Sequence, residues 1–110
     1  MKTIYDALAD STRRRILDLL RDRPHLVGEL TDILEISQPG VSKHLRVLRE
    51  AGLVRVRKEA QRRWYELCPA PLAELDSWLE SYRHLWDDRF DRLDNLLQEL
   101  QAKENKNDQE

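Results

Sequence analysis

The sequence predicts a mostly α-helical α+β protein in which a two-stranded β-hairpin precedes one long C-terminal helix. Three features of the chain support this fold class. Apolar residues recur at helical spacing through residues 3–51. Apolar and basic residues alternate at 53–57, and a second short run at 62–67 has the composition of a returning strand. A heptad of apolar residues then runs from Leu72 to about Gln101.

The helices before the hairpin have recognisable ends. Asp10 and Ser37 suit N-cap positions, because their side-chain oxygens can accept from free backbone N–H groups. Pro39 falls in the first turn of the helix after Ser37, and Gly52 suits its C-terminal end. The expected helices cover about 3–8, 12–21, 26–34 and 38–51. Their apolar faces predict one core, built from Ile16, Leu17, Leu19, Leu20, Val27, Leu30, Ile33, Leu34, Val41, Leu45 and Leu48.

The last helix is too long to be buried by its own domain. About 30 residues at ~1.5 Å each give a helix of roughly 45 Å. A compact domain of about 70 residues is only about 25–30 Å across. Its distal leucines therefore need a partner, and a second copy of the chain is the simplest one. We expect one domain over residues 1–102, with a dimerisation helix at about 71–102 and a disordered polar tail at 103–110.

Composition and charge suggest a small cytoplasmic protein. The one cysteine, Cys68, excludes an intramolecular disulfide, and no apolar run suggests a membrane span or secretory signal. The net charge of −2 is unevenly distributed. Residues 37–63 hold eight Lys/Arg against two Asp/Glu, whereas residues 70–110 hold five against eleven. A local positive potential of this kind is what a phosphate-binding surface requires.

Two helices joined by a tight turn and followed by a basic hairpin form a winged helix-turn-helix, a unit that docks on duplex DNA. With Val41 at the centre of the buried face, Lys43 and Arg46 point away from the core. His44 lies nearer the buried edge, where a phosphate contact or a structural role is expected. The alternative for the hairpin arginines is a solvated edge that blocks aggregation. The predicted DNA-binding residues are Ser37, Gln38, Pro39, Ser42, Lys43, His44, Arg46, Arg57, Lys58, Arg62 and Arg63.

The segments at 9–17 (ADSTRRRIL) and 37–54 (SQPGVSKHLRVLREAGLV) resemble the ArsR family of bacterial transcriptional repressors. The resemblance covers roughly residues 3–100. It implies a winged-helix homodimer built by the first and last helices, with Gln38, Pro39, Ser42 and Lys43 facing the groove and Arg62 and Arg63 in the wing. Ser11 departs from the proline common at that position. The expected dimer interface comprises Ile4, Tyr5, Leu8, Leu79, Tyr82, Trp86, Leu93, Leu96, Leu97 and Leu100.

The metal sites of that family are not matched here. The helix at 26–33 has no cysteine or histidine, and His84 with Asp87 or Asp88 does not complete a tetrahedral set. We therefore expect no metal, no cofactor and no enzyme activity, since no nucleophile–base pair is recognisable. The sequence predicts a repressor that binds an inverted repeat in double-stranded DNA, and it identifies no effector. A metal- or redox-responsive repressor, with Cys68 as a thiol sensor, and a protein-interaction module without DNA binding remain the alternatives.

Overall fold

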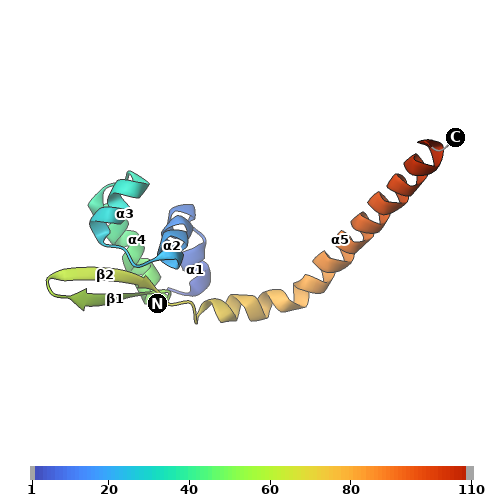
Figure 1. Cartoon of the computed structure of the whole chain (residues 1–110). Helices are drawn as coiled ribbons and strands as arrows, with labels where there is room; N and C mark the ends of the chain where they lie inside the picture. The colour runs from blue at the N-terminus through green and yellow to red at the C-terminus, as the bar shows by residue number, and fades with distance from the viewer. Residues whose placement is uncertain (1, 109–110) are drawn as a thin grey trace. The chain divides into compact units, whose positions relative to one another are not determined.

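The computed structural model describes residues 2–108 and the side chains of all of these except 90 and 105–108. The chain divides into two compact units, one ending at Leu75 and the other beginning at Asp76. In Figure 1 the first four helices form one group, and the hairpin runs along its edge. The elements are α1 (Ile4–Leu8), α2 (Ser11–Asp22), α3 (Val27–Leu34), α4 (Gln38–Glu50), β1 (Val54–Glu59), β2 (Arg62–Leu67) and α5 (Leu72–Asp108).

Three helices of the first unit, α1, α2 and α4, start at N-cap residues whose side chains accept from the backbone. Asp10 Oδ1 accepts from Arg13 N at 3.1 Å, and Ser37 Oγ accepts from Gly40 N at 3.2 Å. Both predicted caps are confirmed. The first helix also has a capping box, in which Thr3 and Asp6 exchange side-chain and backbone hydrogen bonds. This capping box was not predicted from the sequence. Each cap satisfies backbone N–H groups that have no partner inside the helix.

The core contains the predicted stripe of α4. Val41, Leu45 and Leu48 are at most 1% exposed, and they pack with residues of the other helices and of β1. Ile33, which was predicted to be buried, is 44% exposed. The buried face of α3 is centred on Leu30 and Leu34, and Ile33 lies about 100° around the helix from Leu34. A single exposed isoleucine of this kind is ordinary on a soluble protein.

The hairpin is antiparallel and its turn is tighter than expected. The register pairs Val54 with Leu67 at the base and Glu59 with Arg62 at the tip. The sequence placed Lys58 and Glu59 in the turn, but β1 continues through Glu59, leaving only Ala60 and Gln61 as the turn. Ala60 has a φ of 55°, the left-handed conformation that lets the chain reverse over so few residues.

The last helix is longer than predicted. It reaches Asp108, so the expectation of a disordered tail is wrong for residues 103–108, while residues 109–110 lie outside the described part of the chain. No proline or glycine follows Pro71, and Ala102, Lys103 and Glu104 favour helix. Leu72 and Leu75 in its first turn pack against the core. None of the described helices is long and apolar enough to cross a membrane.

Candidate nucleic-acid interface

The exposed face of α4 carries the residues that were predicted to enter the major groove. Because Val41, Leu45 and Leu48 fix the rotation of the helix, Ser42, Lys43 and Arg46 are left in solvent. At its N-terminal end Ser37, Gln38 and Pro39 are also exposed. The side chains on this face are therefore available to hydrogen-bond donors and acceptors on base edges.

The turn between α3 and α4 fixes how these two helices meet. Glu35 ends α3 with a φ of 57°, and its N–H donates to the carbonyl of Thr31 at 2.9 Å. Ser37 then caps α4 only two residues later. A non-glycine residue in this left-handed region has no strong sequence signal, so this conformation was not predicted. The short connection is the tight turn of a helix-turn-helix.

Arg13 joins three helices, a role that no local sequence pattern indicates. Its Nε and Nη2 donate to the carbonyls of Ala7 and Asp6, at 2.8 and 2.9 Å, which satisfies the C-terminal end of α1. Its Nη1 lies 3.3 Å from Nδ1 of His44 on α4. His44 is half-buried, and its contact with Arg13 gives it the structural role that the sequence suggested as one of two possibilities. The other possibility, a contact with phosphate, stays a prediction.

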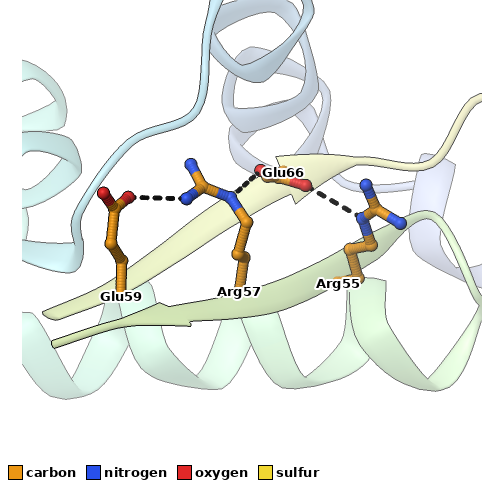
Figure 2. A network of polar contacts seen from close by, with 4 residues as sticks. All are labelled: Arg55, Arg57, Glu59 and Glu66. Atoms are coloured by element: carbon orange, nitrogen blue, oxygen red, sulfur yellow. Dashed lines mark hydrogen bonds and ion pairs between the residues drawn. The ribbon is translucent and has the colours of Figure 1, made fainter.

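One face of the wing is a network of ion pairs, as Figure 2 shows. Glu66 on β2 accepts from Arg55 Nε at 2.9 Å and from Arg57 Nε at 2.5 Å, and Arg57 Nη1 donates to Glu59 at 2.6 Å. Hydrogen bonds from Arg57 and then Arg55 hold the pKa of Glu66 below its ordinary value. Arg57 was predicted to contact DNA, and it is already paired with two carboxylates.

The other face of the wing has a different composition. Residues directly opposite each other in the register share a face, so Val56 and Tyr65 lie on the same side as Lys58 and Arg63. Towards the base this side packs on the core, and towards the tip it presents the two cations, both exposed. Arg62 lies on the opposite side of the hairpin tip, across from Glu59. Lys58 and Arg63 are therefore available to an anion.

Comparisons with known proteins agree with this geometry. Residues 10–56 match the family described as bacterial regulatory protein, arsR family. The HTH-type transcriptional regulator Rv2034 of Mycobacterium tuberculosis is 46% identical over 78 residues, which are 71% of this chain and 73% of the relative. The chain belongs to the ArsR family.

Two further relatives extend the match. The transcriptional repressor SdpR of Bacillus subtilis is 30% identical over 82 residues, which span 74% of this chain and 91% of that repressor. A solved ArsR-like transcriptional regulator from Rhodococcus sp. RHA1 superposes with a TM-score of 0.69 at 28% identity, covering 86% and 87% of the two chains. The elements of this chain and their match to that solved structure confirm the winged helix-turn-helix and the long C-terminal helix that were predicted from the sequence.

The candidate metal and redox residues belong to different elements of the chain. Within the residues that the structure describes, no three His, Cys, Asp or Glu side chains form a group that could hold a metal ion. His84 is exposed on α5, and Cys68 is half-buried just after β2. A third histidine, His25, is buried, and its backbone pairs with Tyr65 of the wing. Its Nδ1 lies 2.8 Å from the carbonyl of Arg23, which gives it a structural role.

Proposed function

We propose that this ArsR-family regulator represses transcription by placing α4 in the major groove of duplex DNA while the wing contacts the adjacent backbone. The observation that carries the proposal is the burial of Val41, Leu45 and Leu48, which leaves Lys43 and Arg46 facing outward beside a basic hairpin. A protein bound at a promoter blocks polymerase sterically. Such a protein acts on the chromosome, so we place it in the cytoplasm.

The roles of the side chains follow from their chemistry. Lys43 and Arg46 suit guanine N7 and O6, and Gln38 suits adenine. Ser37, Pro39 and Ser42 are exposed in the N-terminal part of α4, and together with His44 they would position the helix. On the wing, Lys58, Arg62 and Arg63 would bind phosphates, which adds salt-dependent affinity without sequence information. Arg57 would contribute only by leaving its ion pairs.

The same proposal includes a homodimer. Beyond its first turns, α5 leaves large apolar side chains between 42% and 56% exposed, namely Trp78, Tyr82, Leu85, Trp86, Leu93, Leu96, Leu97 and Leu100. An apolar stripe of this length on an isolated helix would promote aggregation, whereas a second copy of α5 would bury it. Leu79 is half-buried and would join the stripe.

The first helix would add less to this interface than expected. Ile4 is 4% exposed and belongs to the core of its own domain, so it is not available to a partner. Tyr5 is 43% exposed, and Leu8 is half-buried. The period of the helix explains the difference, because Ile4 and Ala7 face inward together and Tyr5 is about 100° away from Ile4. We keep Tyr5 and Leu8 as the contribution of α1.

Selection of bound sequences from a random duplex pool tests the proposal. A dimer should recover an inverted repeat whose half-site centres are about 34 Å apart, one turn of the double helix. Footprinting should then show two symmetric protected segments. Enrichment of one asymmetric half-site would contradict the dimer, and no enrichment would contradict DNA recognition. Zinc or peroxide added to the same assay should leave binding unchanged, and release of the duplex would instead favour a sensor.

A further inference from the structure

A basic hollow lies between the C-terminal half of α4 and the wing. Its lining consists of Arg49 from α4, Val56 and Lys58 from β1, and Arg63 from β2, around a volume of about 310 Å³. A second hollow of about 290 Å³ shares Lys58 and Arg63 and continues to the tip of the hairpin. Three of the four side chains around the first hollow are cationic. Arg49 is not among the residues predicted to contact DNA.

The charges around this hollow are not balanced by the protein. Lys58 and Arg63 lie directly opposite each other in the hairpin, an arrangement of like charges that destabilises a strand pair. Among the described residues, neither of them nor Arg49 makes an ion pair within 4.0 Å. The other face of the wing differs, because Glu59 and Glu66 form ion pairs there with Arg55 and Arg57 (Figure 2).

The position of the hollow indicates which anion would balance these charges. One sugar–phosphate strand separates the major groove from the neighbouring minor groove. A protein with a helix in the first groove and a hairpin reaching towards the second must straddle that strand. The hollow lies where the strand would pass, since α4 forms one wall and the wing forms the other.

We propose that Arg49, Lys58 and Arg63 form a clamp for the phosphates of this strand, with Arg49 as a backbone-contacting residue of the recognition helix. This inference rests on the proposed DNA binding. At ~100° per residue, Arg49 lies within about 20° of Ser42 around α4 and therefore on the DNA-facing flank. Its guanidinium can bind two phosphate oxygens at once, and Lys58 adds a point charge.

Salt-dependent titration of Arg49→Gln tests the clamp. Each lost phosphate contact lowers the slope of log affinity against log salt by about one unit. Arg49→Gln and Arg63→Gln should each show this change on any duplex, while Arg49→Lys should restore most of the slope. Arg21→Gln, which removes one exposed arginine at the end of α2, is the matched control and should leave the slope unchanged. Circular dichroism confirms that the variants are folded.

Replacing one phosphate at a time along the selected duplex with a neutral methylphosphonate identifies the phosphate that the clamp binds. At the clamped position it should weaken the wild-type protein and have no further effect on Arg49→Gln, because both changes remove the same contact. Equal slopes for Arg49→Gln and Arg21→Gln, or additive effects at every phosphate, would overturn the clamp. A changed base preference in Arg49→Gln would also overturn it. A wild-type protein that binds no duplex would contradict the proposed function itself.

Discussion

The guanidinium of Arg13 lies 3.3 Å from Nδ1 of His44 and thereby connects the end of α1 to the recognition helix. Arginine is always protonated and can only donate, so Nδ1 must accept and the ring proton must sit on Nε2. His44 is in this way fixed as a donor on its other nitrogen. An Nε2–H group at the edge of α4 is suited to a phosphate oxygen.

Arg13→Ala should lower the free energy of unfolding by about 1–2 kcal/mol, because the carbonyl of Ala7 loses its side-chain donor and that of Asp6 keeps only the Ala9 N–H. Urea denaturation measures this change. Arg15→Ala, at an exposed position of the same helix, is the control and should stay within about 0.5 kcal/mol of the wild type. Nitrogen NMR of His44 should show the Nε2–H tautomer at neutral pH in the wild type. The Nδ1–H tautomer would contradict the connection.

Glu29 should make the free energy of unfolding depend on pH in the acidic range. Arg23 donates to its carboxylate at 2.7 Å and the Leu26 N–H at 3.0 Å, which lowers the pKa of Glu29 from 4.5 to about 2. Because the folded pKa lies below the unfolded one, the stabilisation is present above pH 4.5 and is lost as the pH falls through about 2. Glu29→Gln should be less stable than the wild type at pH 7, and the gap should close near pH 2.

Chemical denaturation between pH 7 and pH 2 measures the difference in the free energy of unfolding between Glu29→Gln and the wild type. The control is Asp32→Asn, which removes one exposed carboxylate from the same helix. A difference between Glu29→Gln and the wild type that stayed constant from pH 7 to pH 2 would show that the ion pair and cap do not contribute. The effect is expected to be modest, since the pair is exposed and screened by salt.

Two glycines should respond oppositely to the same substitution. Gly52 follows α4 with a φ of 78°, so Gly52→Ala should destabilise the fold by about 1–2 kcal/mol. Gly28 lies inside α3, and a Cβ there would meet nothing within 4 Å. Gly28→Ala should therefore stabilise the protein by about 0.5–1 kcal/mol. Thermal melting distinguishes the two, and equal shifts would disprove the argument.

The proposed dimer predicts a monomeric variant. Leu93→Asp would place a charge in the apolar stripe of α5, at a cost of several kcal/mol to the interface. Sedimentation at micromolar concentration should find a dimer for the wild type and a monomer for Leu93→Asp. Asn95→Asp introduces the same group on the opposite side of the helix, and it should remain a dimer. A monomeric wild type would contradict the dimer, and a Leu93→Asp variant that stayed dimeric would place the interface elsewhere.

Sequence reasoning worked where a pattern is local. The caps at Asp10 and Ser37 and the stripe of Val41, Leu45 and Leu48 follow from spacing and side-chain chemistry within one helix. The end of α5 was missed because polar helix-forming residues resemble a disordered tail in composition. The buried state of Ile4 depends on how α1 is rotated against its neighbours, which a five-residue helix does not encode.

The candidate site also has features that a local pattern predicts and others that depend on how distant segments pack together. Exposure of Lys43 and Arg46 could be predicted from the helical period alone. The pairing of Arg57 with Glu59 and Glu66 depends on the register of the hairpin, and the sequence does not fix that register when the turn length is uncertain. The contact between Arg13 and His44 joins residues 31 positions apart, beyond the reach of any local pattern.

Affinity for the selected operator and for a scrambled duplex, measured by fluorescence anisotropy across a salt series, tests the central claim most directly. Lys43→Ala should weaken operator binding by about 1–3 kcal/mol and have little effect on the scrambled duplex. Arg62→Ala combined with Arg63→Ala should weaken both duplexes alike and flatten the salt dependence. If the wing variant alone changed base preference while Lys43→Ala acted equally on both duplexes, α4 would not be the helix that reads the sequence.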